Sequence, residues 1–218
     1  MVKSQKIPNL KFEKALQREG YLSIAGVDEA GRGAWAGPVV AAAVVLPFLA
    51  RYYGINDSKL LTPLQRECLL TKIHQVAVDI GIGVAEVNEI DKMGIGQATY
   101  LAMRRAVGNL SQIPQYILVD GFKVGFAEVS SQGIIDGDRK SVSIAAASIV
   151  AKVARDRMMR EIHNSIPQYC FNVNKGYGTK LHQLKINEIG ICDWHRKSYQ
   201  PIKKCISYRS NLKIPCQI

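Results

Sequence analysis

The sequence predicts an α/β fold in which helices flank a mixed central sheet. Three observations favour it. Short apolar runs with the length of strands occur early in the chain, and segments with helical spacing then alternate with further strands. No internal repeat, low-complexity tract or linker divides the 218 residues, which suffice for one domain with a sizeable core. Strands interspersed with helices in this way are typical of α/β folds.

The first half of the chain supplies a short helix, three strands and two longer helices. Residues 38–46 are rich in Val and Ala, which indicates a strand buried on both faces. Thr62 followed by Pro63 marks a helix start, because a capping hydroxyl before a proline at the first helical position is favourable. In chain order we expect a helix at 10–18, strands at 22–28 and 38–46, a helix at 62–75, a strand at 77–87 and a helix at 96–109.

The second half supplies two strands and two helices. The longer helix begins with Ile144 and a run of small apolar residues on nearly all sides, so its first turns are expected to be buried. In chain order we expect a strand at 115–119, a weaker strand at 133–136, and helices at 143–163 and 179–188. A basic tail follows.

The composition indicates which class of partner the protein binds and in which cellular compartment it works. The net charge of +11 favours a polyanion such as nucleic acid, although a membrane surface also fits charge alone. The five cysteines are scattered without a C-x-x-C pair, which indicates neither a zinc site nor a disulfide framework and predicts a cytoplasmic protein. The longest apolar stretch, residues 39–50, is too short to span a bilayer, so no membrane association is expected.

A pair of acids stands at the end of the first strand. Asp28 and Glu29 run into a loop, Gly31-Arg32-Gly33, that carries little side-chain bulk. Adjacent carboxylates repel one another and are costly to bury unless a cation compensates them. Glycines beside an arginine let backbone N–H groups approach a bulky anion, most often phosphate. The segment therefore predicts a metal site beside a phosphate site.

Further acids follow the same pattern. Asp120 ends the apolar strand at 115–119, where ligand sites of open α/β sheets gather, although Asp-Gly after a strand is also a common turn. Asp136 and Asp138 precede the buried helix, and chemistry alone does not choose between them. Asp138 lies just before the first turn, where an acid could simply cap the helix or favour its dipole. Hard oxygen ligands without cysteine or paired histidine favour Mg²⁺ or Mn²⁺ over zinc.

Two loop residues have both a functional and an ordinary interpretation. Lys59 lies in a polar turn and is either a phosphate ligand or a solvated charge. Tyr177 stands between two glycines, where its ring could stack on a sugar or base, and a plain turn with a surface aromatic is the equal alternative. No serine or cysteine stands in a nucleophile elbow, so covalent catalysis has little support.

Taken together, these residues resemble bacterial ribonuclease HII (type 2 ribonuclease H) over about residues 20–201. The motifs that carry the resemblance are Gly26-Val-Asp28-Glu29-Ala-Gly-Arg-Gly33, Gly37-Pro38-Val, Asp57-Ser-Lys59, Val119-Asp120-Gly121, Gly137-Asp138, Ser143-Ile-Ala-Ala-Ala-Ser-Ile-Val-Ala-Lys152-Val-Ala-Arg155-Asp156, Lys175-Gly-Tyr-Gly-Thr179 with His182, and His195-Arg-Lys-Ser198.

The resemblance implies an RNase H-like fold with a mixed central sheet, flanking helices and a helical C-terminal part. It implies a catalytic domain at 21–201, with an N-terminal extension at 1–20 and a basic tail at 202–218. The implied activity is cleavage of RNA in RNA–DNA hybrids and incision 5′ to ribonucleotides embedded in duplex DNA, leaving 3′-hydroxyl and 5′-phosphate ends.

The resemblance also assigns roles to residues. Its four metal-binding and catalytic acids fall on Asp28, Glu29, Asp120 and Asp138, which together would hold two divalent ions, Mg²⁺ or Mn²⁺. The loop that reads the 2′-hydroxyl falls on Gly31, Arg32 and Gly33, the ribose-packing tyrosine on Tyr177, and a phosphate contact on Lys59.

Two positions depart from the family pattern, and two rival functions stay open. Asn174 stands where histidine is common, and Gly94 where asparagine is common. The rivals are a nuclease of the same fold that acts on branched DNA, and a non-catalytic nucleic-acid-binding protein. Acids at all four positions argue against the second, because clustered negative charge does not help a pure binder of phosphate.

Overall fold

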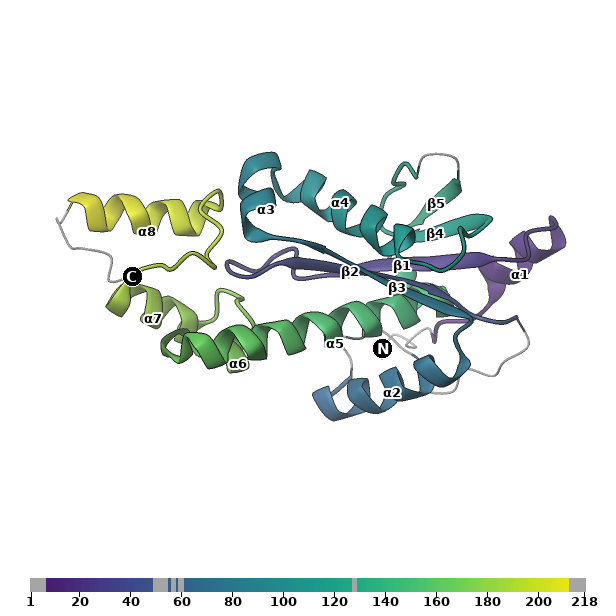
Figure 1. Ribbon diagram of the computed structural model, residues 1–218, viewed down its shortest axis with the longest axis horizontal. Helices are drawn as coiled ribbons and strands as arrows, with labels where there is room; N and C mark the ends of the chain where they lie inside the picture. Colours follow the sequence, from purple (N-terminus) through teal and green to yellow (C-terminus); the bar gives the residue numbers. More distant parts are fainter. Residues whose placement is uncertain (1–6, 49–54, 56–57, 59–60, 127–128, 212–218) are drawn as a thin grey trace, which may run out of the picture. The chain divides into compact units, whose positions relative to one another are not determined.

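A five-stranded mixed sheet forms the centre of the fold (Figure 1). The computed structural model describes residues 7–48, 55, 58, 61–126 and 129–211, with side chains described up to residue 207. The strand order is β3-β2-β1-β4-β5. β1 pairs antiparallel with β2 and parallel with β4, and β4 pairs parallel with β5, which confirms the mixed sheet. The strands are β1 (Ile24–Ala30), β2 (Val39–Val45), β3 (Asp79–Ala85), β4 (Tyr116–Asp120) and β5 (Ser130–Ile134).

Helices make up much of the remaining described chain. The helices are α1 (Lys11–Arg18), α2 (Pro63–Val76), α3 (Val87–Met93), α4 (Ile95–Gly108), α5 (Val142–Ser165), α6 (Phe171–Asn174), α7 (Lys180–Ile189) and α8 (Gln200–Asn211). Short 3₁₀ turns lie at η2 (Gly137–Arg139) and η3 (Pro167–Tyr169). None of the helices in the described segments has the length and hydrophobicity needed to cross a bilayer.

Most of the expected elements are present, with small shifts at their ends. Thr62 caps α2 as expected, and it does so in a capping box: its hydroxyl accepts from the Gln65 N–H, and the Gln65 side chain accepts from the Thr62 N–H. The expected strand at 133–136 is instead β5 at 130–134, because Asp136 adopts a left-handed conformation (φ 52°) that ends extended structure. Helix α3 was not expected, and α8 extends through part of the segment expected to be a tail.

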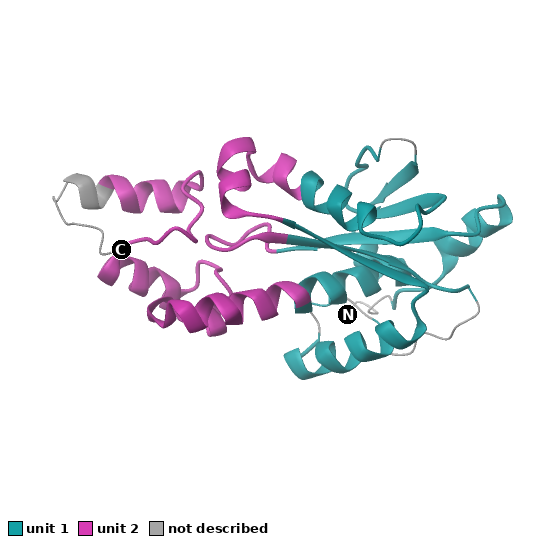
Figure 2. Cartoon of the chain, viewed as in Figure 1, with its two compact units in different colours: residues 1–30, 40–84, 100–153 teal, residues 31–39, 85–99, 154–218 magenta. Residues whose placement is uncertain are grey.

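The chain divides into two compact units, each made of several segments (Figure 2). Unit 1 comprises residues 1–30, 40–84 and 100–153, and unit 2 comprises residues 31–39, 85–99 and 154–218.

In unit 1, helices cover both faces of the sheet (Figure 1). α2 and the first turns of α5 pack on one face, in a core shared with Val44, Ile80 and Ile82. On the other face α4 lies very close to β3, because Gly81 and Gly83 present no side chain to it; a Cβ at either glycine would overlap a carbonyl of α4. The first turns of α5 are fully buried, as their composition predicts.

The core of unit 2 combines apolar and aromatic side chains with charged ones. Met159, Tyr169 and Phe171 pack together, with the Tyr169 and Phe171 rings stacked at 5.5 Å. Arg155 and Arg196 are fully buried in the same unit. Buried arginines require hydrogen-bond acceptors, so their partners determine the local backbone path.

Candidate active site

Three aspartates of unit 1 come together at the sheet. One carboxylate oxygen each from Asp28, Asp120 and Asp138 lies within 4.8 Å of the other two. Val27 is opposite Val119 in the parallel pair β1–β4, so the next residues along the two strands are Asp28 and Asp120. Asp138 comes from η2, directly before α5. Two neighbouring strands and one turn thus converge on a single point.

Backbone geometry selects which acid near α5 joins this group. The N–H of Gly137 donates to Asp120 Oδ1 at 2.7 Å, which ties η2 to the end of β4. Asp138 is buried, with 3% of its surface exposed, and belongs to the group. Asp136 is exposed and lies outside it. Chemistry alone left the choice between these two acids open, and the family resemblance assigned Asp138. Of the two, the fold brings only Asp138 to the other carboxylates.

The environment of Asp28 disfavours its charged form. Burial raises its pKa well above the usual range, and the nearby charges of Glu29 and Asp120 raise it further. Two hydrogen bonds oppose the rise, one from the Ser148 side chain and one from the Glu29 N–H at 2.6 Å. A buried carboxylate with like charges around it is the environment that a bound cation stabilises.

The donor set fits a divalent metal of the hard class. Three aspartates supply oxygen ligands, and two of them are buried. Mg²⁺ and Mn²⁺ prefer such ligands, whereas the described residues around the group offer no cysteine or histidine of the kind that zinc prefers. Glu29, half-buried on β1, is not one of the three residues in this group, although its charge acts on Asp28.

Ser148 links the acid group to a second motif of unit 1. Its hydroxyl lies 2.8 Å from the Ser58 hydroxyl, and the Ser58 carbonyl accepts from Arg66 Nη1 at 2.9 Å. Ser58 is the central residue of the Asp57-Ser-Lys59 motif, and it is buried. Lys59 itself lies outside the described residues.

In unit 2, the loop Gly31-Arg32-Gly33 is held by a buried arginine. Gly31 has φ 93°, which disfavours any other residue, and a Cβ there would overlap the Arg155 guanidinium. Arg155 donates to the carbonyls of Pro38, Lys175 and Ala36 at 2.9–3.1 Å. Burial lowers its pKa to about 10. The Arg155 side chain therefore connects the glycine loop segment to the segment that carries Tyr177.

A second buried arginine binds the same loop. Arg196 donates to the carbonyls of Arg32, Ala34, Gly37 and Pro38 at distances of 2.8–3.1 Å. The Arg32 carbonyl also accepts from the Tyr199 hydroxyl. The loop carbonyls thus accept hydrogen bonds from buried groups of the protein, while the Arg32 side chain is exposed.

Tyr177 is half-buried, and its surroundings fix both its ring and its backbone. The Arg155 guanidinium lies over the ring, 5.3 Å from its centroid. The Tyr177 carbonyl is 2.9 Å from Nδ1 of His182. Gly178 follows directly, and a Cβ at that position would overlap the Trp35 ring. The ring is therefore held by contacts within unit 2 and is not fully exposed.

Two buried histidines, His182 and His195, form a chain of hydrogen bonds that ends at the Tyr177 backbone. Nε2 of His182 lies 3.0 Å from Nε2 of His195. Because a carbonyl can only accept, His182 donates from Nδ1 to Tyr177 and accepts at Nε2. His195 then donates from Nε2 and accepts at Nδ1, where the Cys192 N–H donates at 2.9 Å. One tautomer of each ring thus satisfies these three hydrogen bonds with both rings neutral, and the Cys192 carbonyl, 3.2 Å from the same Nδ1, then accepts no proton from His195.

The two departures from the family pattern have structural explanations in this chain. Asn174 is buried; its side chain donates to the Tyr169 carbonyl at 2.7 Å and accepts from the Gly176 N–H at 2.8 Å. It therefore shapes the turn that precedes Tyr177. Gly94 has φ 80° and ends α3. Neither residue belongs to the carboxylate group.

Comparisons with known proteins agree on one family. A family model described as Ribonuclease HII matches residues 25–202. Ribonuclease HII of Bacillus cytotoxicus is 46% identical over 204 residues, which cover 94% of this chain and 78% of the relative. Ribonuclease HII of Acetivibrio thermocellus is 49% identical over 188 residues, which cover 86% of this chain and 73% of the relative.

Solved structures give the same fold. The crystal structure of ribonuclease H2 from Pyrococcus horikoshii OT3 has a TM-score of 0.72 at 27% identity, over 85% of this chain and 98% of that one. Bst-RNase HIII in complex with Mn²⁺ has a TM-score of 0.69 at 19% identity, over 90% of this chain and 73% of that one. The second match is a likeness of fold alone.

Proposed function

The chain belongs to the ribonuclease HII family, and from this premise we propose that it incises duplex DNA on the 5′ side of embedded ribonucleotides. The broader activity follows from the family. The protein is a ribonuclease H, an endonuclease of the hydrolase class that acts on RNA–DNA hybrids. The proposal adds the single embedded ribonucleotide as substrate, and 3′-hydroxyl and 5′-phosphate ends as products.

The observation that supports the proposal most is the convergence of Asp28, Asp120 and Asp138 within 4.8 Å. Members of this family depend on divalent metal, and we propose that these three acids, with Glu29, hold two ions of Mg²⁺ or Mn²⁺. Such ions, when bound, supply an activated water and stabilise the leaving oxygen of a phosphodiester. The carboxylates themselves act as ligands that fix the positions of the reacting groups.

Other residues have supporting roles in this proposal. Ser148 keeps one Asp28 oxygen hydrogen-bonded and so limits rotation of that carboxylate. The exposed Arg32 side chain, together with Lys59, offsets phosphate charge and positions the strand.

Discrimination of RNA from DNA requires polar groups directed at one 2′-hydroxyl. We assign this role to the backbone of Gly31-Arg32-Gly33, with the Tyr177 ring packing on the ribose. Support comes from the buried Arg155 and Arg196, which hold the carbonyls around this loop in place. A loop whose backbone is fixed in advance loses little conformational entropy when the substrate binds.

One assay tests this function against both rivals. A labelled DNA duplex with a single ribonucleotide is incubated with Mg²⁺ or Mn²⁺, beside an all-DNA duplex and a branched DNA junction. The proposal predicts a single cut 5′ to the ribonucleotide, with a 3′-hydroxyl end that a polymerase can extend. Cutting of the junction alone would identify a branch-specific nuclease, and binding without cutting of any substrate would identify a non-catalytic binder.

A further inference from the structure

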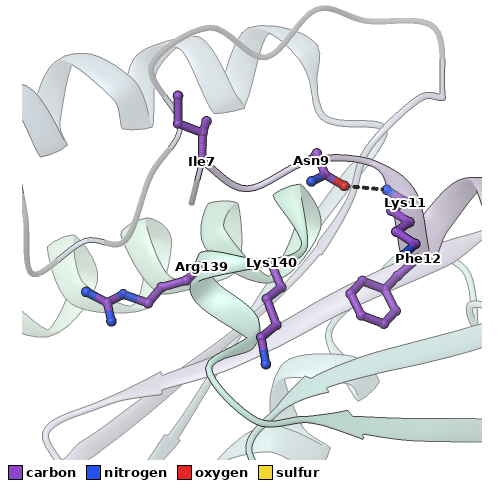
Figure 3. A pocket seen from close by; sticks show the side chains of 6 residues that line it. All are labelled: Ile7, Asn9, Lys11, Phe12, Arg139 and Lys140. Atoms are coloured by element: carbon purple, nitrogen blue, oxygen red, sulfur yellow. Dashed lines mark hydrogen bonds between the residues drawn. The ribbon is translucent and has the colours of Figure 1, made fainter. Parts of the chain in front are cut away.

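Unit 1 contains a cavity of about 460 Å³ that is separate from the three aspartates of the acid group (Figure 3). It lies between the segment that leads into α1 and the residues that follow Asp138. Among the described residues that line it, three are cations and none is an acid. These residues are Ile7, Asn9, Lys11, Phe12, Arg139 and Lys140.

The walls of this cavity are held together by the backbone. Asn9 forms a parallel bridge with Ser141, in which the Asn9 N–H donates to the Lys140 carbonyl at 3.2 Å and the Val142 N–H donates to the Asn9 carbonyl at 3.3 Å. The Asn9 side chain accepts from the Lys11 N–H at 2.9 Å, which fixes the start of α1 (Figure 3). Both walls are thus held in place by contacts within the chain.

A buried acid on α1 strengthens this attachment. Glu13 has 3% of its surface exposed, and its Oε1 accepts from the hydroxyls of Ser141 and Ser143 and from the Ser143 N–H. Because Glu13 points into the protein, its charge is turned away from the basic side of α1. Lys11, two residues earlier, is exposed.

The cations approach the cavity from two different elements. Lys11 comes from α1, whereas Arg139 and Lys140 come from η2 and the residue after it (Figure 3). Lys140 Nζ donates to the Ile135 carbonyl, which holds its ammonium group in place with further N–H donors remaining. Phe12 adds an aromatic ring. Several cations that line one concave site, with no acid among its described lining residues, are suited to a phosphate group.

We propose that this cavity binds a backbone phosphate of the duplex substrate, at a position away from the cut. The inference rests on the proposed function, because it takes the duplex to be the substrate of the acid group. Arg139 directly follows Asp138 in the chain, so a strand engaged at the acid group is near the cavity wall. Phosphate contacts of this kind determine register and affinity but carry no sequence information.

The test measures duplex affinity as a function of salt, in chelator and without divalent metal, so that no cleavage occurs. The variant is Lys11→Ala with Arg139→Ala. The control is Lys14→Ala with Arg18→Ala, which removes the same charge from exposed positions of α1 that do not line the cavity. A fluorescent DNA duplex with one ribonucleotide and its all-DNA counterpart serve as probes.

Loss of the one phosphate contact lowers the slope of log affinity against log salt by about 0.9. Between about 50 and 200 mM salt, the wild type should therefore lose roughly three- to fourfold more affinity than the cavity variant. The control variant should keep the slope of the wild type, and both duplexes should behave alike. Lys11→Glu alone should also weaken duplex binding. Lys11 is exposed, so this variant does not depend on any structural role of Arg139.

Equal slopes for the cavity and control variants would overturn the proposal. A second result would also overturn the proposal. If inorganic phosphate raises the melting temperature of the wild type but not of the cavity variant, and the salt slope is the same in both, the cavity is a site for free phosphate. Failure of the wild type to bind any duplex would instead contradict the proposed function, so the two failures are distinguishable.

Discussion

His182 Nε2 and His195 Nε2 lie 3.0 Å apart in the interior of unit 2. The other ring nitrogen of His182, Nδ1, donates to the carbonyl of Tyr177. This relationship makes the Tyr177 backbone depend on a neutral pair of rings. Both rings are fully buried. Burial lowers the pKa of both histidines, and for His195, where proximity to His182 contributes as well, the pKa falls to about 3.

We expect His195→Gln to reduce selectivity for a single embedded ribonucleotide, because the Tyr177 segment loses its support. The ratio of kcat/KM on that substrate to kcat/KM on a long RNA–DNA hybrid should fall by about tenfold. This is the lower end of the effect expected from losing one stacking interaction with an aromatic ring. The ratio does not depend on the folded fraction of the preparation. His74→Gln, at an exposed position of α2, should leave it unchanged. A ratio equal to that of the wild type would show that Tyr177 does not depend on the pair.

The same pair makes stability dependent on pH. In the unfolded chain each histidine has its ordinary pKa, near 6.5, whereas in the folded protein the rings stay neutral. The unfolded state therefore binds more protons below pH 6.5. The stability that the pair contributes is complete above that pH and is lost as the pH falls toward the folded pKa of about 3.

At pH 5 the loss for His195 amounts to about 2 kcal/mol relative to pH 7. Urea unfolding at several pH values measures it, with His195→Gln as the comparison. The wild type should lose more free energy of unfolding than the variant between pH 7 and pH 5. Parallel curves for the two proteins would mean that His195 titrates normally.

Divalent metal should stabilise the folded protein, because it relieves repulsion among carboxylates that come together only on folding. At a concentration of about 100 Kd, Mg²⁺ or Mn²⁺ should raise Tm by roughly 5–10 °C. An unchanged Tm at saturating metal would count against a clustered-acid site.

The size of this shift should depend on pH through Asp28. Its raised pKa means that the metal-free folded state keeps a proton there to higher pH than the unfolded state does. Metal-free stability from this group is thus present at low pH and is lost as the pH rises through the raised pKa. Metal requires the ionised form, so the Tm increase should be larger at pH 8 than at pH 5, and larger in the wild type than in Asp28→Asn.

Tyr177→Ala should lose roughly ten- to a hundredfold in kcat/KM on a duplex with one ribonucleotide, and far less on a long RNA–DNA hybrid. A hybrid offers many registers, whereas a lone ribonucleotide must be placed in one. Tyr177→Phe keeps the ring and should be milder. Equal losses on the two substrates would mean that Tyr177 only maintains the shape of its loop.

Local signals in the sequence were sufficient for the sheet and most helices, whereas the choice of Asp138 among the acids came from the family resemblance. Thr62-Pro63 marks a helix start through local geometry alone. The Val and Ala residues of β2 are apolar on both faces of the strand, which indicates that both faces are buried. Helix α3 was missed because its cap is Glu86 paired with Glu89, and glutamate is not a typical capping residue.

The supports of the site could not be predicted in the same way. His182 and His195 are 13 residues apart and meet only through the fold of unit 2. Arg155 and Arg196 stand within motifs that were recognised, yet their partners are backbone carbonyls whose positions the sequence does not encode locally. Lys59 lies outside the described residues, so its role stays a prediction.

The most direct test of the central claim compares two acids that are two residues apart. Asp138 is buried within the carboxylate group, and Asp136 is exposed outside it, so Asp138→Asn and Asp136→Asn remove the same charge from nearly the same place in the chain. Incision of a duplex with one ribonucleotide is measured in Mg²⁺ and in Mn²⁺, with duplex binding as the control for folding. We predict that Asp138→Asn abolishes incision while binding is retained, and that Asp136→Asn cuts at the wild-type rate. Near-normal incision by Asp138→Asn, or an equal loss in both variants, would contradict the assignment of the three-aspartate group as the metal site of the enzyme.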